Sequence, residues 1–198
     1  MTNVDQLDFD SKFKEKYFVN DLFGSNSIKI VFILESPHVD EISNKIPAAG
    51  YTGKIMSKII LDKEEPFGKL LKEKFSKVRN YAIMNVSQIP MQLKAYDGSD
   101  RNKIELKKLD NLRKFKKNNP RNDKEKNYSV HLHKKQIKEA IENEITIKKI
   151  KEDFSNRFYE VLKVHKPKII IPCGVIAQAF AESVIGSDFK FGNLSLTP

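Results

Sequence analysis

The stretch IKIVFILESPH at residues 28–38 decides the fold class of this chain. Its first seven residues are almost all apolar and β-branched, which is typical of a strand buried on both faces of a parallel sheet. Polar residues follow at once, from Glu35 to His38. In open α/β sheets, ligands bind beyond the carboxyl ends of the strands. The stretch therefore predicts a central strand and one edge of a binding site.

Alternating strand and helix patterns extend over most of the 198 residues. Two further runs have the character of buried strands, at 81–86 and 168–173, and a weaker one lies at 193–197. Helical spacing of apolar residues occurs at 11–23, 53–61, 66–78, 129–144, 146–165 and 175–184. We expect a single α/β domain over 1–198, a three-layer α/β/α sandwich with a four-stranded, mainly parallel sheet.

The composition excludes several classes of protein. Collagen, coiled coil and full disorder do not fit it, and the longest apolar run, about five residues, is far below the roughly 18 of a membrane span. One cysteine, Cys173, cannot form an internal disulfide, and residues 1–5 lack the basic and then apolar pattern of a secretory signal. We expect a cytoplasmic protein with no membrane contact, no metal and no cofactor.

Most of the net charge of +10 lies in one segment, residues 94–138, called here the basic insertion. It holds 15 Lys or Arg and 6 Asp or Glu, a net charge of +9. Such a segment attracts nucleic acid through its field and through counterion release. DNA, another nucleic acid or a nucleotide is the expected partner; the alternative is a solvated surface with no partner. The expected phosphate contacts are Lys107, Lys108, Lys114, Lys116 and Lys117.

The residues after the first strand are suited to proton transfer. Pro37 separates Glu35 from His38 and allows a tight turn that aims both side chains into one crevice. A carboxylate there can orient or activate water, and a histidine can exchange a proton near neutral pH. The alternative interpretation is that Glu35 accepts hydrogen bonds from loop amides and His38 lies on the rim.

Asn85 ends the second strand and offers one donor and one acceptor together, the complement of a base's pairing edge. The alternative is a turn-forming asparagine. Residues 47–54 are small and Gly-rich before a helix, so their amides could face an anion. They are not a nucleotide-binding P-loop, because the spacer and the Ser or Thr after Lys54 are missing. At the end of the third strand, the Cys173 pattern favours a buried, inert thiol over a nucleophile.

Four segments taken together resemble the uracil-DNA glycosylase superfamily: residues 30–38, 47–53, 81–86 and 169–177. Their order and spacing match over the sheet from residue 28 onward. In that superfamily a first-strand motif of the type Gly-Glu-Ala-Pro-Gly, or Gly-Gln-Asp-Pro-Tyr, shapes the pocket and positions the hydrolytic water. Residues 34–38 occupy that motif here.

The resemblance implies a role for each matching residue. Glu35 or Ser36 would orient water and His38 would end the motif, so these three are the candidate catalytic residues. Asn85 is similar to the asparagine that reads the extruded base. The other residues implied at the base site are Pro37, Gly50, Tyr51 and Gly53.

This sequence also departs from the superfamily pattern. Ala48 stands where an aromatic residue stacks on the base, so Tyr51 would have to supply stacking, and Ser36 replaces the aspartate that activates water. One cysteine cannot hold the iron–sulfur cluster of some members. The sequence ends at residues 194–198, about where a His-Pro-Ser motif would begin. Either the chain is truncated there or it lacks a histidine whose loss would slow catalysis by about 100- to 1000-fold.

The expected function is hydrolysis of the N-glycosidic bond of a flipped, uracil-like base, or a diverged activity on nucleic acid or a nucleotide. The alternative is a non-catalytic nucleic-acid-binding module on the same fold. Whether the chain is an enzyme is left open between these two. Excision of uracil from labelled DNA, measured together with salt-sensitive binding, discriminates them.

Overall fold

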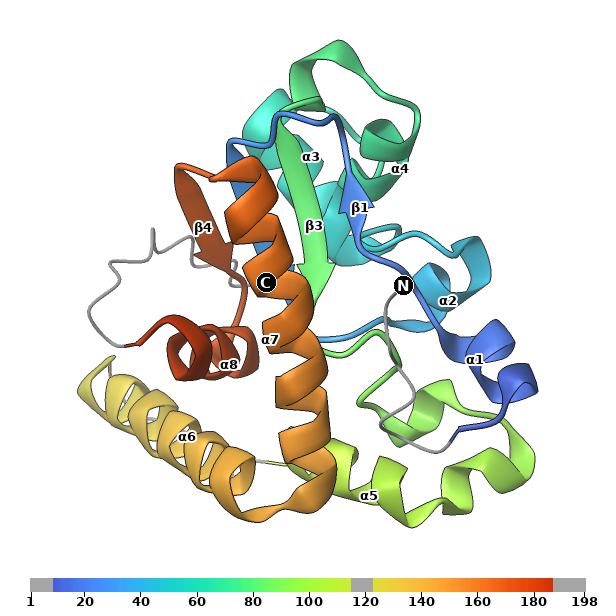
Figure 1. Ribbon diagram of the computed structural model, residues 1–198, viewed down its shortest axis with the longest axis vertical. Helices are drawn as coiled ribbons and strands as arrows, with labels where there is room; N and C mark the ends of the chain where they lie inside the picture. Colours follow the sequence, from blue (N-terminus) through green and yellow to red (C-terminus); the bar gives the residue numbers. More distant parts are fainter. Residues whose placement is uncertain (1–8, 115–122, 187–198) are drawn as a thin grey trace.

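The computed structural model describes residues 9–114 and 123–186. In chain order the elements are α1 (Ser11–Tyr17), β1 (Leu22–Phe23), β2 (Ile30–Leu34), α2 (Val39–Asn44), α3 (Tyr51–Leu61), α4 (Phe67–Lys72), η1 (Ser76–Val78), β3 (Tyr81–Asn85), η2 (Leu93–Ala95), η3 (Gly98–Asn102), α5 (Ile104–Asn111), α6 (Asp123–Asn143), α7 (Ile145–His165), β4 (Ile169–Pro172) and α8 (Val175–Ile185). Short helices connect β2 to β3 and follow β3, and two helices of 21 residues each follow the gap (Figure 1).

The four strands form one mixed sheet in the order β1-β3-β2-β4. β3 and β4 run parallel to β2 on its two sides, whereas β1 pairs antiparallel with β3. The α/β class is confirmed, but the expectation of a mainly parallel sheet is wrong. The chain enters the sheet through a two-residue antiparallel edge strand, a common addition to α/β sheets. The strand expected at 193–197 lies outside the described residues.

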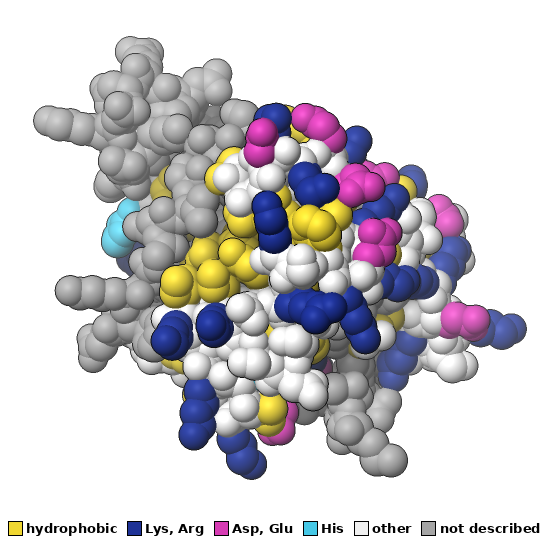
Figure 2. Space-filling view, turned by 90° about the horizontal axis from the view of Figure 1, so that it is seen from above, with side chains coloured by type: hydrophobic (Ala, Val, Ile, Leu, Met, Phe, Trp, Pro, Cys, Tyr) yellow, Lys and Arg dark blue, Asp and Glu magenta, His cyan; other side chains and the backbone are white. Residues whose placement is uncertain are grey.

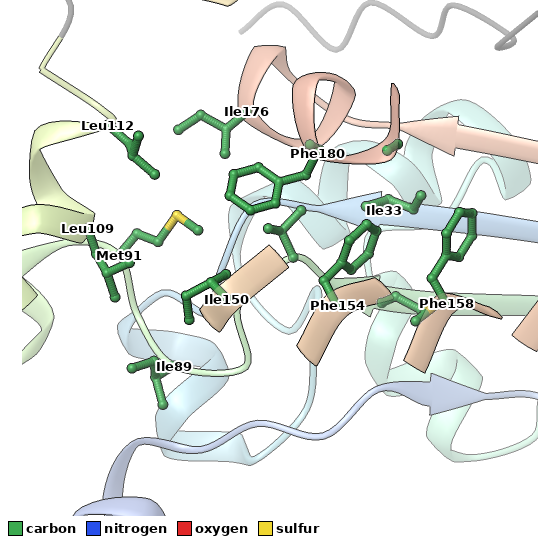
Figure 3. Close-up of a cluster of buried hydrophobic side chains, with 14 of the residues drawn as sticks. Ile33, Ile89, Met91, Leu109, Leu112, Ile150, Phe154, Phe158, Ile176 and Phe180 are labelled. Atoms are coloured by element: carbon green, nitrogen blue, oxygen red, sulfur yellow. The ribbon is translucent and has the colours of Figure 1, made fainter. Parts of the chain in front are cut away.

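Helices cover both faces of the sheet (Figure 1). Alternate side chains of β2 point to opposite faces. Ile33 faces α7 and α8, and Figure 3 shows it beside Phe154, Phe158 and Phe180. On the other face, Phe32 packs with Phe67 of α4, their ring centroids 5.7 Å apart. Burial on both faces explains why this strand is apolar throughout.

The first helix is shorter than its periodicity predicts. Asp10 caps it, since its Oδ1 accepts a 2.8 Å hydrogen bond from the Phe13 amide. The helix ends at Tyr17, and the Val19 amide then donates to the Gln88 carbonyl at 2.9 Å. Tertiary hydrogen bonds thus extend the chain toward β1, although residues 18–23 continue the helical spacing.

Other predicted boundaries also shift. The helix expected at 66–78 divides into α4 and η1, and α2 was not expected at all. The basic insertion contains a short charged helix, α5, which the helical spacing did not predict. The helix α6 begins at Asp123, six residues earlier than predicted.

Arg157 of α7 holds the ends of several elements together. Its guanidinium forms ion pairs with Asp21 at 2.6 Å and Asp153 at 2.8 Å. It also donates to the carbonyls of Asn85 and Val86, both at 3.0 Å. The Arg157 side chain is only 5% exposed. This buried cluster joins α7 to the segment before β1 and to the carboxyl end of β3.

We therefore expect Arg157→Met to lower the free energy of unfolding by about 3 to 5 kcal/mol, because it leaves two buried carboxylates and two carbonyls without their cation. Urea denaturation followed by circular dichroism measures the change. Lys58→Met, which removes an exposed ion pair with Asp62, serves as the control and should leave the midpoint unchanged. Equal stability of Arg157→Met and the wild type would contradict this structural role.

Candidate functional site

A cleft of about 440 Å³ lies beyond the carboxyl ends of β2 and β4. This volume is in the range of small-molecule sites, which occur at this edge of α/β sheets. The walls come from the end of β2, from α2, from the start of α3 and from the basic insertion. They consist of Leu34, Glu35, Ser36, His38, Asp40, Glu41, Ala48, Gly50, Tyr51, Thr52, Gln92, Lys94, Arg113 and Cys173.

The structure brings together most of the residues that the sequence singled out. All three candidate catalytic residues line the cleft, and so do two of the candidate base-binding residues, Gly50 and Tyr51. Three others are not in its walls: Pro37, Gly53 and Asn85. Pro37, Gly53 and Asn85 are all buried.

Glu35 is the acidic group best suited to chemistry in the cleft. Its Oε1 forms an ion pair with Arg113 Nε, and its side chain is 27% exposed. Burial raises the pKa of the Glu35 carboxyl, and the positive charge of Arg113 partly opposes that shift. A carboxylate with a raised pKa is a stronger base than an exposed one.

Glu41 is a buried carboxylate that the sequence analysis missed. Its Oε2 accepts a 2.7 Å hydrogen bond from the His38 amide, and its Oε1 accepts one from the Ala48 amide. Burial raises the pKa of Glu41, and the two amides oppose that shift. Glu41 thus joins the end of β2 to the segment before α3. A glutamate three residues after a helix cap signals such a contact, but His38 is not a usual cap residue.

The two glycines allow close packing around the start of α3. A Cβ at Gly53 would lie 1.8 Å from the Ala48 carbonyl oxygen, and one at Gly50 would lie 2.6 Å from Asp40 Oδ2. Their contacts therefore give them a packing role. Tyr51, by contrast, is 68% exposed and has its ring free at the rim of the cleft.

The other candidates at the cleft have distinct local partners. Ser36 Oγ accepts a 3.1 Å hydrogen bond from the Met91 amide, which fixes the loop after β3. His38 is exposed at the start of α2. Burial raises the pKa of the Cys173 thiol to about 12, so it stays protonated, in keeping with the inert thiol that the sequence favoured.

Asn85 is fully buried, and its carboxamide has no hydrogen-bond partner among the described residues. It pairs in parallel register with Leu34, which lines the cleft. Side chains at paired positions of parallel strands point to the same face of the sheet. The Asn85 carboxamide therefore lies on the same face as Leu34, behind the residues that line the cleft. Its backbone is fixed, because its amide donates to Asp21 and its carbonyl accepts from Arg157. A buried amide without a partner is costly and needs an explanation.

The basic insertion is only partly available to a ligand. Lys108 forms an ion pair with Glu144 at 3.1 Å, and Lys114 forms one with Asp110 at 2.7 Å. Lys107 is exposed, whereas Lys116 and Lys117 lie outside the described residues. The two basic residues of the insertion that do line the cleft, Lys94 and Arg113, were not singled out from the sequence.

Comparisons with protein-family models, curated proteins and solved structures found no match. Within residues 9–114 and 123–186, no three His, Cys, Asp or Glu side chains cluster closely enough to hold a metal ion. No helix in this same part of the chain has the length and apolar character to cross a bilayer.

The ion pair in the cleft leads to a prediction about titration. Arg113→Gln removes the charge that opposes the effect of burial, so the pKa of Glu35 should rise further above its usual value. Folding already raises the pKa of Glu35 above its value in the unfolded chain. The stability that Glu35 contributes is therefore present at low pH and is lost as the pH rises through the pKa of the folded state. Carboxyl carbon NMR shifts followed with pH measure the change. Lys107→Gln, in the same insertion, should have no effect, and an unchanged Glu35 pKa in Arg113→Gln would exclude the ion pair.

Proposed function

We propose that this chain hydrolyses the N-glycosidic bond of a base flipped out of nucleic acid, as a diverged relative of the uracil-DNA glycosylase superfamily with its three-layer α/β/α fold. The observation that carries the proposal is the buried carboxamide of Asn85, which has no partner among the described residues and lies on the cleft face of the sheet. An extruded base would supply both missing hydrogen bonds.

Recognition of the base would depend on Asn85 and Tyr51. The carboxamide presents a donor and an acceptor in one plane, which complements an imide edge such as that of uracil. Tyr51 is exposed at the rim and can stack on a base that enters the cleft. Small movements of Leu34, which lines the cleft, would connect the cleft with the Asn85 carboxamide.

Glu35 would activate the hydrolytic water. A water molecule held by Glu35 attacks the anomeric carbon of the sugar, and the bond from that carbon to the base nitrogen breaks. The bonding electrons leave with the base as an anion, and the proton of the water passes to the Glu35 carboxylate. The base anion then takes up a proton, so the products are the free base and a sugar hydroxyl. The raised pKa of Glu35 suits it to this step.

The cations at the cleft would hold the phosphates next to the extruded nucleotide. Lys94 and Arg113 line the walls, and both belong to the basic insertion. Arg113 is also paired with Glu35, so a phosphate could compete for it and leave the carboxylate free. His38, exposed beside them, can donate a proton at the rim.

A second candidate function is binding of nucleic acid without chemistry. The ion pair between Arg113 and Glu35 favours it, because a neutralised carboxylate is a weak base. The two functions use the same basic insertion and the same cleft. They differ only in whether the glycosidic bond is broken.

An excision assay tests the proposal. The wild type should create alkali-labile sites in an end-labelled oligonucleotide that contains one uracil, in the single-stranded or the duplex form. Glu35→Gln should abolish this activity while binding to the same oligonucleotide persists. Binding without any alkali-labile product, at protein in excess over DNA, would select the second function.

The role of Asn85 leads to a prediction in which stability and function change in opposite directions. Asn85→Leu removes a buried polar group without a partner, so the free energy of unfolding should stay equal or rise by about 1 to 3 kcal/mol. Excision should fall at least about 100-fold, because the base loses its hydrogen bonds. Urea denaturation and the excision assay measure the two effects.

Ser57→Ala is the matched control, since Ser57 is also fully buried, has a hydroxyl with no partner in the described part of the chain, and does not line the cleft. It should not change excision. A marked loss of stability in Asn85→Leu would mean that the amide has a structural role instead.

A further inference from the structure

Besides the basic insertion, a basic surface lies at the opposite end of the sheet from the cleft, where β2, β3 and β4 begin. Figure 2 looks onto this end and shows Lys and Arg side chains gathered around a hydrophobic band. We call it the amino-end surface and define it by six exposed side chains: Lys29, Lys74, Lys77, Arg79, Lys166 and Lys168. It includes no residue of the basic insertion.

Backbone hydrogen bonds fix part of this surface as a row. The Lys29 amide donates to the Asn80 carbonyl at 2.7 Å, and the Lys168 amide donates to the Lys29 carbonyl at 2.9 Å. Arg79 precedes Asn80, and its Nε donates to the Lys74 carbonyl at 3.4 Å. Neighbouring strands lie about 4.8 Å apart, so the backbone positions that carry cations at three adjacent strand starts are held side by side on a rigid edge.

The amino-end surface and the basic insertion differ in how their cations are paired with acidic residues. None of the six cations lies within ion-pair distance of an Asp or Glu among the described residues. In the insertion, most of the described cations have an acidic partner: Lys108, Arg113, Lys114, Lys134, Lys135 and Lys138. Unpaired cations on a rigid frame generate the stronger field for a polyanion.

We propose that the amino-end surface binds the phosphate backbone of nucleic acid, independently of the cleft. A row of cations across adjacent strand starts matches a linear polyanion, which carries one phosphate per 3.4 Å of axis on each strand. The side chains of Asn26 and Asn80, exposed on the same edge, add neutral donors of the kind that contact phosphate oxygens. This contact carries no sequence information and would hold the protein on nucleic acid whatever the cleft does.

Salt-dependent binding of two charge-matched variants tests the proposal. The first carries Lys29→Gln, Lys77→Gln, Arg79→Gln and Lys168→Gln. The second carries Lys107→Gln, Lys108→Gln, Lys114→Gln and Lys138→Gln in the basic insertion. Fluorescence anisotropy with a labelled oligothymidine, and with a duplex of the same length, gives the slope of log affinity against log salt. Each lost phosphate contact lowers the slope by about 0.7 to 0.9.

The first variant should lose a slope of about 3, and the second should lose less than half as much. Equal losses in the two variants, or an unchanged slope in the first, would overturn the proposal. So would tighter binding of the wild type to phosphatidylserine vesicles than to either oligonucleotide, if the first variant abolished it.

The cleft variants Glu35→Gln and Asn85→Leu separate this inference from the proposed function. Neither removes a cation of the amino-end surface, so adding the four substitutions of the first variant to either one should lower the slope by about 3, as in the wild-type background. If the protein excises no base but the first variant still loses its slope, the proposed function fails and the amino-end surface stands. A smaller loss of slope in the cleft-variant background than in the wild-type background would overturn the independent contact.

Discussion

The buried guanidinium of Arg157 is the interaction on which the rest of the structure depends. It neutralises Asp21 and Asp153 and satisfies the carbonyls at the end of β3. A buried cation is tolerated only when its partners are complete, so the positions of α7, the segment before β1 and the end of β3 are mutually constrained. The position of Asn85 at the carboxyl end of β3 follows from this constraint, because its backbone N–H and its backbone carbonyl both belong to the cluster.

A buried carboxylate, Glu41, has a similar role in the wall of the cleft. Glu41 accepts the amides of His38 and Ala48, and thereby fixes two loops that are ten residues apart in sequence. With Ser36 bonded to the Met91 amide, three loops around the cleft are held by side chains of the residues 36–41. The wall of the cleft is thus preorganised, while Tyr51 and His38 remain exposed at its rim.

Apolar patterning was sufficient to predict the buried strands. β2, β3 and β4 fall within the predicted runs because burial on both faces requires apolar residues throughout. β1 escaped prediction, since two residues on an edge carry almost no pattern and the preceding helix-like spacing was overridden by tertiary hydrogen bonds.

The same contrast holds for the site. Strand ends indicated Glu35 and Ser36, because polar residues directly follow an apolar run. Arg113 could not be found in this way: it approaches Glu35 from a separate segment, 78 residues further along the chain, and only the packing of the insertion brings them together. The count of charged residues likewise identified the basic insertion. It could not show which of the insertion's cations form ion pairs with acidic residues, because those pairs depend on tertiary structure.

We propose that the carboxamide of Asn85, which has no partner among the described residues, binds a base. Proton–nitrogen NMR of the side-chain amide of Asn85, assigned through its loss in Asn85→Leu, tests this claim most directly during titration with free uracil. The account predicts a downfield shift of the amide protons and slower exchange with water as uracil binds. Binding that shifts signals around the cleft but leaves the Asn85 amide unchanged would contradict it.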